Sequence, residues 1–267
     1  MNINEMRRRI SLLPPLPPDA GRWQYHAGIL RQDILEQDPE EFLTWPTVVS
    51  TMFVGDGSQL REEYAELRKC SSWFHYERAV QEDGVGNPRI SEMAPGMNAN
   101  LLHQVYHLSR WEITTGRHIK DLSSIVEVGG GYGGFAKVCR QLRFGGSYTL
   151  IDLPEFLILQ EYYLSKTCGI QGINFVSNPA MLPAKADLLI GIYSMSEMSP
   201  TERQSILKQV KAENYLLAFQ EVYDGVNNDE YFENYATNRG GAWRWVHAAG
   251  MPSCRYLIGA PDFPEAL

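Results

Sequence analysis

The spacing of apolar residues divides the chain into a helical first part and a second part in which short β-rich runs alternate with helical segments. Apolar positions recur every three to four residues over 28–44 and 57–82, and again from about 98 to 116. That period places them on one side of a helix, so we predict three helical segments. Asn98 or Asn100 can cap the last one, and the glycine at its end can stop it.

From residue 122 onward, six short runs carry the composition of β-strands. The predicted strands are 124–128, 147–151, 173–176, 186–192, 215–220 and 256–259. The predicted helices between them are 132–142, 155–166 and 200–211. Strands that alternate with helices of this length predict an α/β fold with a parallel sheet and right-handed crossovers. The pattern gives no clear seventh strand, so it leaves open whether a final antiparallel hairpin is present.

This change of pattern predicts two parts. Residues 1–118 are expected to form an N-terminal helical extension or lid, and residues 119–267 a Rossmann-like, doubly wound, mostly parallel sheet. Residues 1–22 are predicted to be an irregular leader, because a cluster of prolines ends the apolar run at 10–13. An arm that touches a membrane surface is the alternative for this leader.

Composition and charge narrow the classes of function. The 267 residues are 44% apolar and 21% charged, which is typical of a folded globular protein. The net charge of −8 argues against a nucleic-acid partner, because duplex-binding domains usually carry a basic face. No run approaches about 18 apolar residues, so stable membrane insertion is not expected. The four cysteines are far apart, which predicts reduced thiols in a cytoplasmic protein.

The strongest motif is a glycine-rich turn that follows the first predicted strand and opens a helix. Five of the six residues from 129 to 134 are glycine. Glycine suits this place because the turn is tight, a ligand approaches the backbone, and the helix packs close to the strand. Gly129, Gly131 and Gly134 match the GxGxxG pattern of dinucleotide sites. Gly129, Gly131 and Gly133 match the GxGxG pattern of class I methyltransferases.

Glu127 decides between these two templates. It stands two residues before the first glycine, where a dinucleotide-binding strand usually stays apolar. A carboxylate there resembles the acidic-x-Gly-x-Gly-x-Gly motif of class I methyltransferases, which use S-adenosyl-L-methionine. The resemblance implies that Glu127 lies near the methionine end of this cofactor and helps to neutralise its ammonium group. It also implies that Gly129, Gly131 and Gly133 bind the cofactor.

Asp152 ends the second predicted strand, 19 residues after Gly133. This is close to the spacing of about 20 residues for an acid that binds ribose hydroxyls. A carboxylate can accept hydrogen bonds from both hydroxyls of the ribose, which explains the residue type. The alternative is that Asp152 caps the helix predicted from residue 155. We predict the ribose contact.

Three further polar residues follow the third and fourth predicted strands. Asn178 is predicted to lie near the adenine of the cofactor, with a turn-forming Asn-Pro as the alternative. Ser194 and Glu197 stand at the end of strand four, where doubly wound sheets place their ligands. Ser194 is predicted to contact the cofactor and Glu197 the acceptor. A solvated loop acid is the alternative for Glu197.

Taken together, segments 126–134, 151–154 and 193–198 resemble a family of bacterial sugar O-methyltransferases associated with surface polysaccharide synthesis. The resemblance covers about residues 98–260. It implies methyl transfer to a sugar or glycan hydroxyl, in polysaccharide or glycoconjugate biosynthesis, with a small-molecule acceptor.

A sugar hydroxyl is a poor nucleophile while protonated, so we expect a general base near it. The candidates are His103, Glu197 and His247. His103 and His107 are four residues apart and share one face of a predicted helix. His247 follows an aromatic segment, 243–245, whose rings suit the apolar face of a sugar, although ordinary core packing is the alternative. No metal site is predicted.

Two other functions compete with methyl transfer. An NAD-dependent oxidoreductase or epimerase is indicated by the dinucleotide-type spacing of Gly129, Gly131 and Gly134. That motif usually stands near an N-terminus, whereas about 120 residues precede it here. A non-catalytic relative of the methyltransferases, acting as a binding module, is the other alternative.

Overall fold

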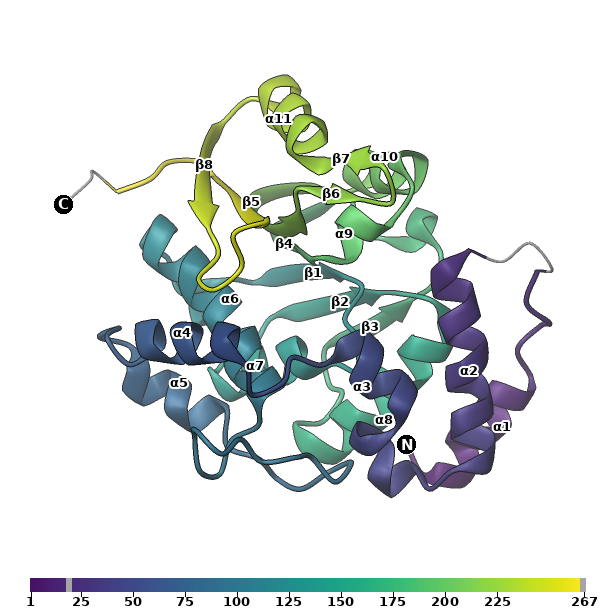
Figure 1. The fold of residues 1–267 in the computed structure, drawn as a ribbon. Coiled ribbons are helices and arrows are strands. Elements are labelled where there is room, and N and C mark those ends of the chain that lie inside the picture. The colour runs from purple at the N-terminus through teal and green to yellow at the C-terminus, as the bar shows by residue number, and fades with distance from the viewer. Residues whose placement is uncertain (18–20, 265–267) are drawn as a thin grey trace.

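In the computed structural model, which describes residues 1–17 and 21–264, a seven-stranded sheet forms the centre of the molecule (Figure 1). Its strands are β1 (Ser124–Val128), β2 (Ser147–Ile151), β3 (Ile173–Val176), β4 (Lys185–Ile192), β5 (Lys211–Gln220), β8 (Ala242–His247) and β9 (Cys254–Ala260). The spatial order is β3-β2-β1-β4-β5-β9-β8. The first five strands are parallel, and β9 is antiparallel to both β5 and β8. The predicted Rossmann-like, doubly wound, mostly parallel sheet is confirmed.

The sheet has a seventh strand, β8, which the sequence pattern left open. β8 and β9 form an antiparallel hairpin at one edge of the sheet. β8 is an edge strand whose six residues alternate between half-buried and exposed positions toward its end. β8 pairs with a strand along one edge only, and its residues are half-buried or exposed. It therefore lacks the continuous apolar run by which buried strands are recognised.

Helices cover both faces of the sheet (Figure 1). α6 (Ala99–Thr115), α7 (Gly134–Gln141) and α8 (Pro154–Thr167) lie on one face, and α10 (Pro200–Gln209) and α11 (Asn228–Arg239) lie on the other. Neighbouring residues of one strand enter opposite cores: Leu188 and Ile190 pack with the first group, and Leu189 packs with the second. This alternation follows from the two-residue period of a strand, and it explains why buried strands are apolar throughout.

The helix predicted over 98–116 is confirmed as α6. Asn98 caps it by accepting a hydrogen bond from the Leu101 N–H at 2.7 Å. Gly116 ends it in the left-handed conformation, with φ of 67°. The asparagine at the start and the glycine at the end are the two residues from which the bounds of this helix were predicted.

The remaining elements lie before β1 or in the connections that follow the strands. They are α1 (Ile3–Ser11), α2 (Arg22–Glu36), η1 (Pro39–Thr44), α3 (Pro46–Met52), α4 (Ser58–Leu67), α5 (Trp73–Ala79), η2 (Ile119–Asp121), η3 (Pro179–Met181), α9 (Ser194–Glu197), β6 (Val222–Tyr223) and β7 (Val226–Asn227). The division predicted after residue 118 falls between α6 and η2. Side chains on both sides of it, such as Leu30 and Ile125, belong to one hydrophobic core.

The prediction of an irregular leader is wrong over α1. Met6 and Ile10, four residues apart, are fully buried, and Asn2 caps the helix. The prolines that suggested an irregular segment follow the end of this helix. Residues 18–20 of the predicted leader lie outside the described residues.

Two ion pairs connect α1 and α2 with α8. Arg9 pairs with Glu161 at 2.5 Å, and Arg31 pairs with the buried Glu155. These pairs hold the N-terminal helices beside the helix that follows Asp152. Across residues 1–17 and 21–264, no helix has the length and apolarity needed to cross a bilayer, and the four cysteines are free.

Candidate functional site

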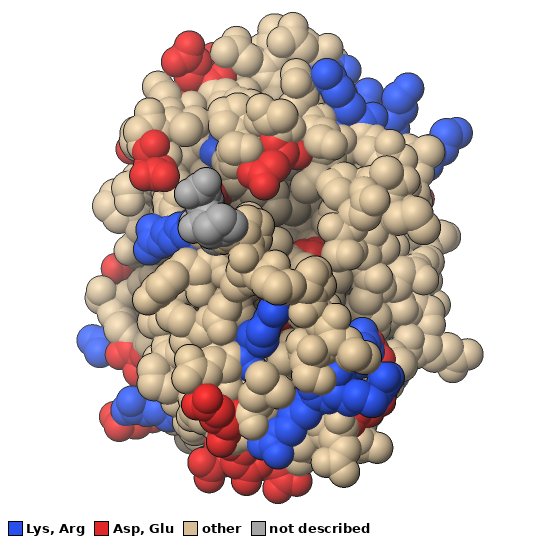
Figure 2. Space-filling model, turned by 90° about the vertical axis from the view of Figure 1, so that its right-hand side faces the viewer, with Lys and Arg blue, Asp and Glu red and all other residues tan. Residues whose placement is uncertain are grey.

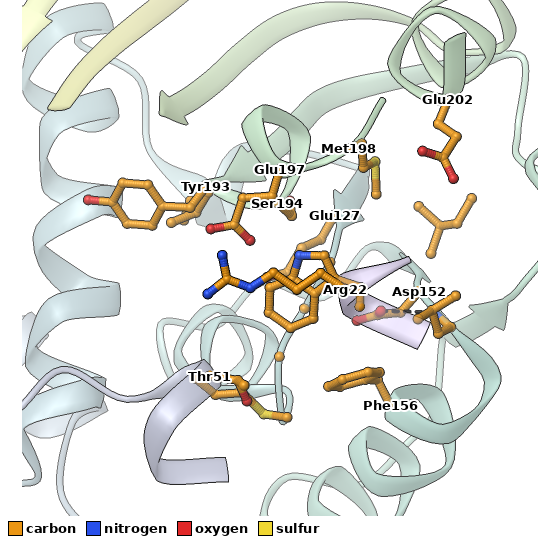
Figure 3. A pocket seen from close by; sticks show the side chains of 18 of the residues that line it. Arg22, Thr51, Glu127, Asp152, Phe156, Tyr193, Ser194, Glu197, Met198 and Glu202 are labelled. Atoms are coloured by element: carbon orange, nitrogen blue, oxygen red, sulfur yellow. Dashed lines mark hydrogen bonds between the residues drawn. The ribbon is translucent and has the colours of Figure 1, made fainter. Parts of the chain in front are cut away.

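A cavity of about 840 Å³ lies beyond the carboxyl ends of β1, β2 and β4 (Figure 3). Its floor is the glycine turn and the residues that end these strands, and its other walls come from the beginning of α2 and from residues 50–54. The face shown in Figure 2 is hollowed near its centre, with acidic side chains close to the hollow. The carboxyl ends of parallel strands are where doubly wound sheets bind their ligands.

Two glycines of the turn have different functions: Gly129 allows close packing against β4, and Gly131 leaves space in the cavity. At Gly129, with φ of 71°, an added Cβ would stand 2.3 Å from the Ser194 Cβ, so the turn and the end of β4 touch only because this residue is glycine. Gly131, with φ of 56°, lines the cavity and leaves room for a ligand against the backbone. Gly133 precedes α7 as its N-cap and is not among the residues that line the cavity.

Glu127 reaches the cavity from the end of β1 and is only 4% exposed. The Tyr148 hydroxyl donates a hydrogen bond to Glu127 Oε2 at 2.7 Å. Burial raises the pKa of Glu127 to about 7; the Tyr148 hydrogen bond opposes this rise, and the negative charge of Asp152 adds to it. A buried carboxylate with one neutral partner is a suitable neighbour for a cationic ligand group.

Asp152 ends β2 and also lines the cavity. It accepts hydrogen bonds from the Leu153 N–H and from Gln160 Nε2, both at 2.8 Å. Leu153 is the N-cap of α8, and no side chain caps that helix, so the helix-cap alternative is wrong. Burial raises the pKa of Asp152 to about 7 against these hydrogen bonds.

Gln160 is a residue that sequence reasoning missed. Its Nε2 donates both to Asp152 Oδ2 and, at 3.0 Å, to the Gly131 carbonyl. It therefore fixes the aspartate and the glycine turn relative to each other. The available signal was a polar residue inside the apolar run of α8, where it is fully buried.

Asn178 takes the role of a turn residue. Its Oδ1 accepts a hydrogen bond from the Ala180 N–H at 3.0 Å and so caps η3. Its two neighbours, Ser177 and Pro179, line the cavity, whereas Asn178 does not. The turn-forming alternative fits this geometry.

The end of β4 makes a sharp turn at Tyr193. Its backbone has φ of 59° and ψ of −39°, a strained conformation for a residue with a side chain. The turn places Ser194 and Glu197 at the cavity, where Ser194 Oγ donates to the Val128 carbonyl.

The carboxylate of Glu197 points into the cavity, facing the guanidinium of Arg22 (Figure 3). Gln220 Nε2 donates a hydrogen bond to Glu197 Oε1 at 3.3 Å. Burial raises the pKa of Glu197, while the Gln220 hydrogen bond and the charge of Arg22 lower it. This carboxylate is both accessible to a ligand and partly withdrawn from water, which suits a general base.

His103 lines the cavity, but both of its ring nitrogens have partners inside the protein. The Glu63 carboxylate lies 2.8 Å from Nδ1, and His107 Nε2 lies 2.9 Å from Nε2. His107 Nδ1 in turn lies 2.6 Å from the Tyr256 hydroxyl. Burial holds the pKa of His107 well below its ordinary value, with a further contribution from His103. To accept a proton from a ligand, His103 would have to give up its bond to His107.

His247 ends β8 and is exposed. It is not among the residues that line the cavity. Trp243, in the same strand, packs on Gly259 and lies 5.0 Å from the Tyr215 ring, as the core-packing alternative describes. The structure therefore brings Glu127, Asp152, Ser194, Glu197 and His103 together, and leaves His247 and Asn178 outside.

Several cavity residues were missed because they lie at or just after the end of the predicted leader, residues 1–22, or in the short β6–β7 hairpin. Arg22 and Trp23 begin α2, and Arg22 Nη1 donates to the Tyr223 hydroxyl at 3.1 Å. Among the described residues, one guanidinium and no lysine line the cavity, against five carboxylates. Those carboxylates belong to Glu127, Asp152, Glu197, Glu202 and Asp224. The described residues contain no group of three or more His, Cys, Asp or Glu that could hold a metal ion.

Comparison with known proteins gives similarities to solved structures. A SAM-dependent methyltransferase from Aquifex aeolicus matches with a TM-score of 0.45 and 16% identity, covering 58% of this chain and 88% of that one. An O-methyltransferase family protein from Burkholderia thailandensis matches with a TM-score of 0.44 and 13% identity, covering 76% and 72%. The mitomycin 7-O-methyltransferase MmcR matches with a TM-score of 0.44 and 12% identity, covering 93% and 73%.

No protein-family model matches the chain, and no curated protein matches it. All three TM-scores lie below 0.5, so we base the function on the residues of the cavity.

Proposed function

We propose that this protein is a methyltransferase that uses S-adenosyl-L-methionine and acts on a hydroxyl of a sugar or glycan, in cytoplasmic polysaccharide or glycoconjugate biosynthesis. One observation carries the proposal. The buried carboxylate of Glu127 and the half-buried carboxylate of Asp152 stand at the carboxyl ends of two neighbouring parallel strands and meet the glycine turn at one cavity. Asp152 would accept the ribose hydroxyls, and Glu127 would neutralise the ammonium group of the methionine part.

The sheet order argues against the dinucleotide alternative. The dinucleotide-binding fold has the order 3-2-1-4-5-6. Here the antiparallel strand β9 is inserted between β5 and β8. Together with Glu127, this arrangement favours the methyltransferase over the NAD-dependent enzyme.

When bound, the cofactor supplies an electrophilic methyl group on a sulfonium sulfur. The protein has to hold an acceptor hydroxyl in line with that methyl group, and such positioning accounts for much of the acceleration in reactions of this kind. Glu197 faces the cavity and would take the proton of the hydroxyl as the new bond to oxygen forms. The lid predicted over 1–118 would contribute Arg22 and Trp23 from α2 to the acceptor side.

The acceptor side of the cavity suits an uncharged, hydroxyl-rich molecule. Trp23 and Tyr223 offer aromatic rings to the apolar face of a sugar, and Gln104 offers an amide to its hydroxyls. The single guanidinium already lies beside Glu197 and bonds Tyr223. Anionic acceptors, such as nucleotide sugars, would therefore meet more carboxylates than cations.

Calorimetry and a transfer assay together test this function. We expect the demethylated cofactor, S-adenosylhomocysteine, to bind with a measurable heat and NAD not to bind. With methyl-labelled cofactor, we expect label to enter neutral glycans. Binding of NAD alone would refute the proposal. Binding of S-adenosylhomocysteine without transfer to any hydroxyl would favour the non-catalytic binding module, and transfer only to catechols, proteins or RNA would refute the sugar acceptor.

The two raised pKa values predict opposite pH trends for binding and stability. Both carboxyls titrate at about 7 in the folded protein. Since each is proposed to act ionised, cofactor affinity should rise between pH 6 and 8, by about tenfold for each group. A carboxyl whose pKa is higher when folded favours the folded state at low pH. These two groups should therefore lower the free energy of unfolding of the ligand-free protein as the pH rises from about 4 to 7.

Calorimetry with S-adenosylhomocysteine between pH 6 and 8 measures the trend in affinity. Thermal unfolding of the ligand-free protein between pH 4 and 7 measures the trend in stability. Glu127→Gln and Asp152→Asn should each flatten the affinity trend. An affinity that does not change between pH 6 and 8 in the parent protein would contradict the ionised roles.

A further inference from the structure

Arg203, on α10, is a buried charged side chain that does not line the cavity. It is fully buried, and none of the ion pairs found within residues 1–17 and 21–264 includes it. Burying a charge without an opposite charge is costly unless many hydrogen bonds replace the lost water. Burial accordingly lowers the pKa of its guanidinium from the ordinary value.

The hydrogen bonds of Arg203 converge on the turn that carries Glu197. Nη2 donates to the Ser196 carbonyl at 2.5 Å, and Nε donates to the Met198 carbonyl at 2.8 Å. These two carbonyls belong to the residues on either side of Glu197. The guanidinium therefore fixes the backbone both immediately before and immediately after the residue whose carboxylate enters the cavity.

A second set of hydrogen bonds connects Arg203 with the amide that holds the Glu197 carboxylate. Arg203 Nη1 donates to Asn228 Oδ1 at 2.6 Å, and Asn228 Nδ2 donates to the Gln220 carbonyl at 2.9 Å. The Ser196 hydroxyl lies 2.5 Å from both Gln220 Oε1 and the Tyr193 carbonyl, and it shares its single proton between these two acceptors. With its oxygen held by Ser196, the Gln220 amide turns its Nε2 toward Glu197, to which it donates.

We propose that Arg203 is a positioning residue for Glu197. This inference rests on the proposed function, in which Glu197 takes the proton of the acceptor. A guanidinium is needed because its planar fork can serve three acceptors in fixed directions, whereas a lysine ammonium on a flexible stem cannot. A neutral apolar side chain could fill the same space, but it could make none of the three hydrogen bonds that hold this turn.

A double-mutant cycle tests the inference. We expect Arg203→Met to lower kcat by about 10²-fold, the loss that a misplaced catalytic group produces, while the dissociation constant of S-adenosylhomocysteine and the acceptor KM change by less than about threefold. In a Glu197→Gln background, the same substitution should have no further effect on kcat, because its target is already absent. Arg203→Lys should have a higher kcat than Arg203→Met, but it should recover less than half of the loss in log kcat.

Ser196→Ala is the milder variant for the case in which Arg203→Met fails to fold. It removes the hydroxyl that contacts Gln220 and the Tyr193 carbonyl and leaves the hydrogen bonds of Arg203 in place, so a smaller loss of kcat is expected, again absent in the Glu197→Gln background. Losses that multiply in the double variants would overturn the inference, because they would show structural damage independent of Glu197. Full activity of Glu197→Gln would overturn it as well.

Crystal structures of the parent and of Arg203→Lys give a readout that needs no acceptor. We expect the turn of residues 194–198 to be displaced in the variant, with the Glu197 carboxylate no longer bonded to Gln220. An unchanged turn would overturn the inference whatever the assay shows. Absence of S-adenosylhomocysteine binding by the parent protein would instead count against the proposed function, and the crystal structures would still decide the role of Arg203.

Discussion

Replacing Glu197 with glutamine should lower kcat by about 10²–10⁴-fold, the range over which a positioned general base contributes. Glutamine keeps the size of the side chain and can still bond Gln220, but it cannot accept the proton of the acceptor hydroxyl. The binding of S-adenosylhomocysteine should stay within about threefold of the parent, since Glu127 and Asp152 are untouched. Steady-state kinetics with a methylated glycan as product, together with calorimetry, measures both quantities.

His247→Ala is the matched control for this experiment. His247 is exposed and lies outside the cavity, so the variant should keep full activity. If Glu197→Gln is as active as the parent, the base lies elsewhere. His103→Ala would then be the next variant, because that ring lines the cavity although His107 occupies its Nε2.

Asp152→Ala should raise the dissociation constant of S-adenosylhomocysteine by about 10- to 150-fold. This corresponds to the loss of hydrogen bonds to a charged acceptor, about 1.5–3 kcal/mol. The variant should remain folded, because Asp152 does not cap α8 and its two partners, the Leu153 N–H and Gln160, can bond water once the cavity is open.

Asn178→Ala is the control for the cofactor site. Asn178 was predicted from the sequence to approach the adenine, but its side chain caps η3. Removing it should change cofactor affinity by less than about twofold. Equal losses for Asp152→Ala and Asn178→Ala would mean that both act through the shape of the strand ends, and the ribose contact of Asp152 would be wrong.

The inner strands of the sheet were predictable because they are buried on both faces, and the edge strand β3 was recognised from its β-rich composition. Three of the strands, β1, β2 and β3, have the bounds expected from their apolar runs. The cofactor side was predictable for a related reason. Glu127 and Asp152 each end one of these runs, and the parallel pairing of β1 with β2 brings such ends to one edge of the sheet.

The acceptor side was not predictable, because its walls depend on contacts between distant parts of the chain. The prolines concealed α1, and the start of α2, which places Arg22 and Trp23, lies between the predicted leader of residues 1–22 and the helical segment predicted from residue 28. Arg203 reads as an ordinary charge on a surface helix until its burial is known. His247 was favoured by its aromatic neighbours, but an edge strand carries it away from the cavity.

The bond from Arg22 to Tyr223 joins residues 201 positions apart, and the pair of Arg9 with Glu161 spans 152. On the ribosome, the glycine turn and Asp152 emerge well before the hairpin that carries Tyr223. A nascent chain that ends before Tyr223 lacks the contact with Arg22, because such long-range contacts repay their loop-closure entropy only when both partners are present. A ligand that needs walls from both parts of the chain binds tightly only after synthesis has passed Tyr223. An acceptor that contacts both Arg22 and Tyr223 can thus stabilise the folded protein, but it cannot guide the early steps by which the protein folds.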